Sequence, residues 1–160
     1  MASRLFNIIA VWISSGFGSG YSLRAPGTVG SIAALIFWVL LAKLEWLPSL
    51  TSQIVLGAVT TIVGTVAVFF ATRRGSSKDP QWIVIDEWAG LFIALIGIQP
   101  TQWLLVLLAW VSFRFFDVSK IGPVGVAEEL PGAVGIMGDD VVAGFLASLV
   151  VWAARSALSL

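Results

Sequence analysis

Long apolar segments constrain this chain more than any other feature of its sequence. Residues 54–70 (IVLGAVTTIVGTVAVFF) carry no charged side chain. With their flanks they are long enough for a helix that crosses a bilayer, which needs about 20 mostly apolar residues. Shorter or charge-interrupted apolar segments occupy residues 29–42, 83–98, 103–113 and 141–154. We therefore expect an all-α integral membrane helical bundle with about five membrane helices.

The composition supports a membrane-embedded chain. Charged residues make up only 11% of the sequence and hydrophobic residues 58%, whereas soluble domains are usually about 25% charged. The length of 160 residues suits a single domain over residues 1–160. Residues 4–15 (RLFNIIAVWISS) are more typical of an interfacial helix than of a sixth membrane span.

The missing residue types exclude several kinds of chemistry. The sequence has no cysteine and no histidine, so it offers no disulfide, no thiolate nucleophile, no phosphohistidine and no zinc site of the usual kind. Catalysis or metal binding must use carboxylates, hydroxyls, lysine, arginine and the backbone. The net charge of zero gives no reason to expect a nucleic-acid partner.

The charged residues sort to one side of the membrane if the helices alternate in direction. Lys43 and Arg155 fall on one side, and the other basic residues fall on the opposite side, which is therefore cytoplasmic by the positive-inside rule. Every acidic residue except Glu45 also falls on that cytoplasmic side. Five separate segments thus converge on one membrane face, which is the strongest functional signal in the residues themselves.

The segment VIDEWAG places Asp86 and Glu87 at the start of an apolar helix. They could simply stabilise the helix N-terminus, where negative charge is favoured by about 0.3–1 kcal/mol. However, apolar residues flank the pair on both sides, and a charge deep in a span costs roughly 2.5–3.5 kcal/mol. Such carboxylates usually face a polar cavity that contains a partner.

The segment FRFFDVSK supplies candidate partners. Arg114, Asp117 and Lys120 are spaced three residues apart, so on a helix they share one face. The simpler interpretation is a helix end whose charges pair internally. The functional interpretation is one metal-ligating carboxylate between two cations that neutralise phosphate.

The segment GIMGDDVVAG begins the last apolar helix with Asp139 and Asp140. One aspartate is enough for a helix cap, and adjacent carboxylates repel each other unless a cation lies nearby. With Asp86 or Glu87 and Asp117, they offer the hard oxygen ligands that Mg²⁺ prefers, for one or two ions. Which of the two aspartates binds metal stays open.

Two further polar segments are candidates for phosphate binding. In PGTVGS, Pro26 and Gly27 form a turn, and Thr28 or Ser31 could cap a helix whose N-terminus binds an anion; an ordinary loop is the alternative. In KDPQW, just before the third apolar segment, Lys78 is a candidate for phosphate binding and Asp79 a candidate metal ligand. A solvated turn is the simpler interpretation there.

Taken together, the four blocks GFGSG…APGTVGS, KDPQWIVIDEWAG, FRFFDVSK and GIMGDDVVAG resemble the phosphatidylglycerophosphatase A family of bacterial membrane phosphatases, in the family's order and over most of the chain. The resemblance implies an all-helical, Mg²⁺-dependent enzyme that hydrolyses phosphatidylglycerophosphate to phosphatidylglycerol and inorganic phosphate. It assigns the family's motif positions as follows: acidic positions to Asp79, Asp86, Glu87, Asp117, Asp139 and Asp140, basic positions to Arg114 and Lys120, and the N-terminal polar block to Pro26, Gly27, Thr28 and Ser31.

From this resemblance we expect a multi-pass protein of the bacterial cytoplasmic (inner) membrane with its active site on the cytoplasmic face. The expected partners are the lipid substrate and membrane lipid, without nucleic acid; a homo-oligomer stays open. We expect direct attack by metal-bound water with one carboxylate as general base, and an aspartyl-phosphate intermediate is the other possibility. The competing function is a small cation transporter, which would spread its carboxylates through the membrane depth.

Overall fold

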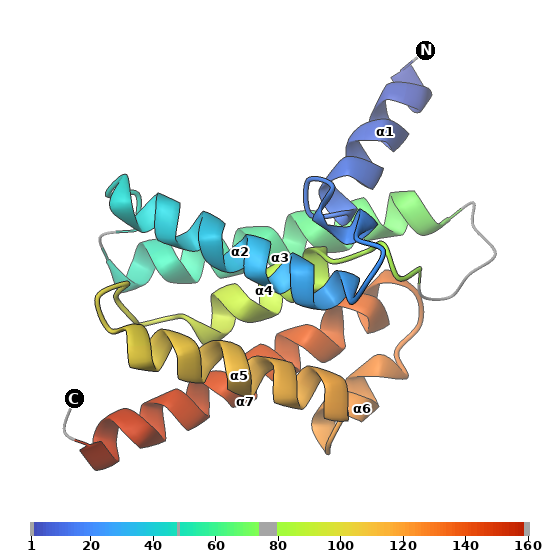
Figure 1. The fold of residues 1–160 in the computed structure, drawn as a ribbon. Helices are drawn as coiled ribbons and strands as arrows, with labels where there is room; N and C mark the ends of the chain where they lie inside the picture. The colour runs from blue at the N-terminus through green and yellow to red at the C-terminus, as the bar shows by residue number, and fades with distance from the viewer. Residues whose placement is uncertain (1, 48, 74–79, 159–160) are drawn as a thin grey trace.

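The computed structural model describes residues 2–47, 49–73 and 80–158, and within these ranges all regular secondary structure is helical (Figure 1). This confirms the all-α prediction. The helices are α1 (Ala2–Ser14), the short 3₁₀ helix η1 (Ser19–Tyr21), α2 (Pro26–Lys43), α3 (Leu50–Thr72), α4 (Ile85–Ala94), α5 (Trp103–Ser119), α6 (Pro123–Glu128) and α7 (Ala133–Leu158).

Three of these helices are long and apolar enough to cross a membrane: α2, α3 and α7. They contain the predicted spans at residues 29–42, 54–70 and 141–154, and they confirm a membrane helical bundle. The predicted spans at residues 83–98 and 103–113 do not reach this length. Helix α4 has only 10 residues, about 15 Å of helix, and α5 has 17 residues.

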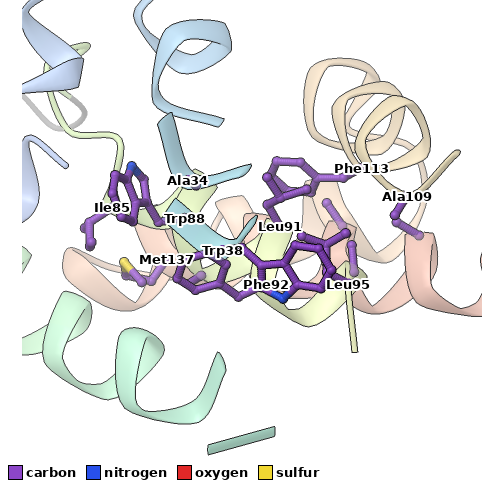
Figure 2. Close-up of a cluster of buried hydrophobic side chains, with 14 of the residues drawn as sticks. Ala34, Trp38, Ile85, Trp88, Leu91, Phe92, Leu95, Ala109, Phe113 and Met137 are labelled. Atoms are coloured by element: carbon purple, nitrogen blue, oxygen red, sulfur yellow. The ribbon is translucent and has the colours of Figure 1, made fainter. Parts of the chain in front are cut away.

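Helix α4 is short because it lies inside the protein rather than against lipid. It packs on α2, α3, α5 and α7, and its Trp88, Leu91 and Phe92 belong to the buried core (Figure 2). Trp38 from α2 and Phe113 from α5 complete the core around it. A helix covered by other helices does not need to match the bilayer thickness. The apolar run at residues 83–98 therefore reflects burial in the protein.

Helices α4 and α7 approach each other closely through two glycines. A Cβ atom added to Gly144 would overlap the backbone carbonyl of Gly90, and one added to Gly90 would overlap the carbonyl of Asp140. Small residues at a helix crossing let the two backbones come into direct contact. This contact fixes α4 relative to the first turns of α7, which carry Asp139 and Asp140.

The turn after α4 is held by a polar side chain from a membrane span. Gln53 of α3 is buried; its Nε2 donates to the carbonyl oxygen of Ile98 at 3.2 Å, and its Oε1 accepts from the backbone N–H of Gly97 at 2.7 Å. Arg155 Nη1 also donates to the Gly97 carbonyl, at 3.1 Å. Buried backbone groups of an irregular segment need such partners.

Replacing Gln53 by leucine is expected to lower the free energy of unfolding by about 1–3 kcal/mol, because it removes the partner of the half-buried Gly97 N–H and of the buried Ile98 carbonyl. Thermal unfolding of the purified protein in detergent measures the effect. Thr61→Val is the matched control in the same helix, because the Thr61 hydroxyl bonds only the Gly57 carbonyl of its own helix. Equal stability of the two variants would show that Gln53 does not hold the turn.

The charged ends of the helices gather at one end of the bundle. In Figure 1 the beginning of α2, the end of α5, α6 and the beginning of α7 lie at the same end. The opposite end holds Lys43 in the last turn of α2 and Arg155 in the last turn of α7. The polar segments that are distant in sequence are therefore neighbours in space.

Candidate active site

A cavity of about 1160 Å³ opens at the charged end of the bundle. Its walls come from the beginning of α2, the beginning of α4, the end of α5, the α6–α7 connection and the beginning of α7. The predicted site residues that line it are Gly27, Asp86, Glu87, Arg114, Asp117, Lys120, Asp139 and Asp140. The structure thus brings four of the predicted polar segments to one cavity.

Three carboxylates form a tight group on the α4–α7 side of the cavity. Asp86, Glu87 and Asp140 each offer one oxygen, and these oxygens all lie within 4.8 Å of one another. Asp140 is only 3% exposed. Oε2 of Glu87 is buried and has no hydrogen-bond partner among the described residues. One buried and two half-buried carboxylates at this separation require a positive charge or protons among their oxygens.

The other two carboxylates are bound by cations in an alternating series. Asp117 accepts from Arg114 Nη1 at Oδ2, and its Oδ1 lies 3.3 Å from Lys120 Nζ. Lys120 Nζ also donates to Asp139 Oδ2 at 2.5 Å, and Arg114 Nη1 lies 3.8 Å from Glu87 Oε1. The three-residue spacing in FRFFDVSK therefore does place Asp117 between the two cations.

The adjacent aspartates of α7 have different surroundings. Asp140 joins the group with Asp86 and Glu87. Asp139 accepts from Lys120 at one oxygen and from the backbone N–H of Asp140, at 2.8 Å, at the other. Neighbouring residues on a helix point in directions about 100° apart, which accounts for this separation. The geometry favours Asp140 over Asp139 as a metal ligand.

Lys120 is a permanent positive charge in this site. Burial lowers the pKa of its ammonium group, but the hydrogen bond and the charge of Asp139, together with the charges of Asp140 and Asp117, outweigh burial and raise the pKa above its ordinary value. A lysine in this state stays protonated at neutral pH. It suits charge neutralisation rather than proton transfer.

The donor set fits a hard divalent cation. Among the described residues, the cavity is lined by seven carboxylates and two cationic side chains, Arg114 and Lys120, and both cations already contact carboxylates. Mg²⁺ binds through one or two carboxylates together with water and substrate phosphate oxygens. The unpartnered Oε2 of Glu87 is an available ligand atom of the right kind.

The candidate phosphate-binding residues at the start of α2 separate into two groups. Pro26 and Gly27 line the cavity, whereas Thr28 and Ser31 do not. Ser31 is fully buried; its hydroxyl donates to the Thr28 carbonyl at 3.0 Å and accepts from Trp110 Nε1 at 3.1 Å, so it joins α2 to α5. Neither Thr28 nor Ser31 caps α2, because the N-cap is Ala25, without a side-chain cap.

Gly27 has a role that the sequence alone does not predict. A Cβ atom at this position would overlap Glu87 Oε1 and would lie 3.3 Å from Arg114 Nη1. The glycine therefore provides the space in which Glu87 and Arg114 meet. A glycine directly after the first proline of a helix indicates that a close neighbour is possible at this position. The sequence does not show that the neighbours are Glu87 and Arg114. Lys78 and Asp79, the remaining candidates, lie outside the described residues.

Comparison with known proteins identifies similar sequences over nearly the whole chain. The family model described as phosphatidylglycerophosphatase A matches residues 12–155. A Bacteroides thetaiotaomicron protein, provisionally named a phosphatidylinositol-3-phosphatase, is 36% identical over 93% of this chain and 95% of its own. The phosphatidylglycerophosphatase A proteins of Escherichia coli and Haemophilus influenzae are 33% and 37% identical, each over 88% of this chain and over 80% and 85% of their own lengths. No solved structure matches.

Proposed function

The chain belongs to the phosphatidylglycerophosphatase A family, and from this premise we propose that it removes the terminal phosphate of phosphatidylglycerophosphate in a Mg²⁺-dependent reaction. The products are phosphatidylglycerol and inorganic phosphate. The observation that carries the proposal is the group formed by Asp86, Glu87 and Asp140 beside the cations Arg114 and Lys120, all in one cavity.

The proposed location is the bacterial cytoplasmic (inner) membrane, with the cavity facing the cytoplasm. Three helices long and apolar enough to span a membrane support the membrane location. The distribution of basic residues supports the orientation, because lysine and arginine are enriched in cytoplasmic loops. Arg114 and Lys120 line the cavity, and Arg24 and Arg73 directly follow its lining residues Leu23 and Thr72.

In this proposal Asp86, Glu87 and Asp140 hold Mg²⁺. The bound ion would polarise a phosphoryl oxygen and lower the pKa of a coordinated water molecule. Asp117 and Asp139 act differently, because they bind Arg114 and Lys120 and so fix the positions of the two cations. This division follows the contacts of each carboxylate.

The reaction requires one bond to form and one to break. The oxygen of a water molecule attacks phosphorus, a carboxylate of the cavity accepts the water proton, and the bond from phosphorus to the glycerol oxygen breaks. The leaving oxygen then takes up a proton and becomes the free hydroxyl of phosphatidylglycerol. Arg114 and Lys120 offset the charge on the phosphoryl oxygens, which is the main requirement of phosphoryl transfer.

Cation transport is the competing function, and the placement of charges argues against it. A transport path needs carboxylates at successive depths of the membrane. Among the described residues, the buried carboxylates collect in one cavity at one end of the bundle. Arg114 and Lys120 lie between them, and positive charges there oppose passage of a cation.

The proposal is tested by product analysis with two lipids. Purified protein with Mg²⁺ is given phosphatidylglycerophosphate or, because of the name of the Bacteroides relative, phosphatidylinositol 3-phosphate. Released phosphate is measured, and the lipid product is identified by mass spectrometry. We expect phosphatidylglycerol to form at least tenfold faster than phosphatidylinositol. Faster hydrolysis of the inositol lipid would overturn the assigned substrate, and no release from either lipid would overturn the phosphatase proposal.

A further inference from the structure

The cavity also has an apolar wall, which the proposed chemistry does not use. Leu23, before α2, is fully exposed at 101%, and Val118, in the last turn of α5, is 71% exposed. Leu130, between α6 and α7, is 48% exposed. All three line the same cavity as the carboxylates. Part of its rim is therefore apolar, beside the exposed carboxylates of Glu128 and Glu129.

Val118 is also the end of an apolar stripe along the outer face of α5. Leu104, Leu107, Val111, Phe115 and Val118 recur every three or four residues, and each is about half exposed or more. Residues at this spacing share one face of a helix. Helix α5 runs from the opposite end of the bundle to the charged end (Figure 1), and Val118 in its last turn lines the cavity.

The last turns of α5 thus present two surfaces of opposite character. Arg114 and Lys120 point to the carboxylates of the cavity. Val118 lies between them in the sequence and joins the exposed stripe. A phosphorylated lipid has the same division between a charged phosphate and a hydrocarbon chain.

We propose that an acyl chain of the lipid phosphate substrate lies along the α5 stripe and enters the cavity past Val118, an inference that rests on the proposed function. The five residues of this track are all uncharged and apolar. The hydrocarbon contact at Val118 makes the site selective for acylated phosphate monoesters over water-soluble ones.

An exposed apolar stripe on α3 is less suitable. On α3, Val59, Ile62, Val66 and Phe69 are exposed, but the residue of α3 that lines the cavity is Thr72. The Thr72 hydroxyl donates to the Val68 carbonyl at 2.7 Å. The apolar surface of α3 therefore ends before the cavity, whereas that of α5 continues into it.

The test compares acylated phosphatidylglycerophosphate in detergent micelles with its deacylated, water-soluble counterpart, which keeps the same phosphates and glycerol units. The readout is the ratio of kcat/KM for the acylated substrate to that for the deacylated one. In Val118→Ser we expect this ratio to fall about tenfold, mainly through a higher KM for the acylated substrate. Val118→Leu, which keeps an apolar side chain, should retain the ratio of the unmodified protein.

Val126→Ser is the matched control. Val126 is 67% exposed at the same end of the bundle but does not line the cavity, so the ratio should not change. An equal ratio in Val118→Ser and Val126→Ser would overturn the inference and leave the phosphatase proposal standing. An unmodified protein that hydrolyses the deacylated compound as well as the acylated one would also overturn it. Release of phosphate from neither compound would overturn the proposed function itself.

Discussion

Replacing Asp140 by asparagine is expected to lower turnover by about 10²–10³-fold while the protein stays folded. Asp140 is buried and shares a group of close carboxylate oxygens with Asp86 and Glu87. Asparagine has nearly the same shape, but it removes the negative charge that would hold Mg²⁺ and orient the phosphate. Initial rates of phosphate release at saturating substrate and Mg²⁺ measure the effect, and circular dichroism checks the fold.

Asp139→Asn is the matched control, since the two residues are adjacent on the same helix. Asp139 binds Lys120 and the backbone N–H of Asp140, so it positions a cation instead of joining the carboxylate group. Loss of a supporting interaction of this kind typically lowers metal affinity or activity by about 10–100-fold. Raising the Mg²⁺ concentration should partly restore the rate of phosphate release in Asp140→Asn but not in Asp139→Asn. A more severe loss in Asp139→Asn would reverse the roles assigned to the two aspartates.

Replacing Gly144 by alanine is expected to destabilise the protein by about 1–3 kcal/mol and to lower activity with it. The new Cβ would overlap the backbone carbonyl of Gly90, and a helix backbone cannot move aside as the end of a flexible side chain can. Relief requires α4 and α7 to separate. That movement would carry Asp86 and Glu87 away from Asp140, so activity should fall even in molecules that remain folded.

Gly138→Ala is the control for the glycine prediction. Gly138 lies on the same helix, but the nearest atoms to its added Cβ are at 3.8 Å, an ordinary contact distance. We expect its stability to stay within about 0.5 kcal/mol of the unmodified protein. Thermal unfolding in detergent compares the two variants. A Gly144→Ala protein as stable and active as Gly138→Ala would contradict the close backbone contact of α4 and α7.

The sequence predicted the fold class because long uninterrupted apolar segments are typical of helices that cross a membrane. Residues 54–70 became part of the long helix α3. The segment at residues 83–98 was misjudged because hydropathy does not distinguish lipid from protein surroundings. Helix α4 is apolar since α2, α3, α5 and α7 cover it, and its glycine contact with α7 depends on a partner that is remote in sequence.

The position of the candidate site was easier to predict than its internal contacts. Alternation of the helices placed Asp86, Glu87, Asp117 and the Asp139–Asp140 pair on one membrane face, and the structure brings them into one cavity. Which carboxylate meets which cation depends on the rotation of each helix about its axis. The rotation of α2 also explains why Ser31 contacts Trp110 instead of lining the cavity. No local sequence motif predicts the rotation of a helix about its axis.

Metal dependence tests the central claim most directly. Purified protein is treated with a chelator and its helix content is checked by circular dichroism. Release of phosphate from phosphatidylglycerophosphate is then measured before and after Mg²⁺ is returned. We predict no release in the chelator, full recovery with Mg²⁺ for the unmodified protein, and little recovery for Asp140→Asn at the same Mg²⁺ concentration. Undiminished release in the presence of the chelator would contradict the assignment of Asp86, Glu87 and Asp140 as the ligands of a catalytic magnesium ion.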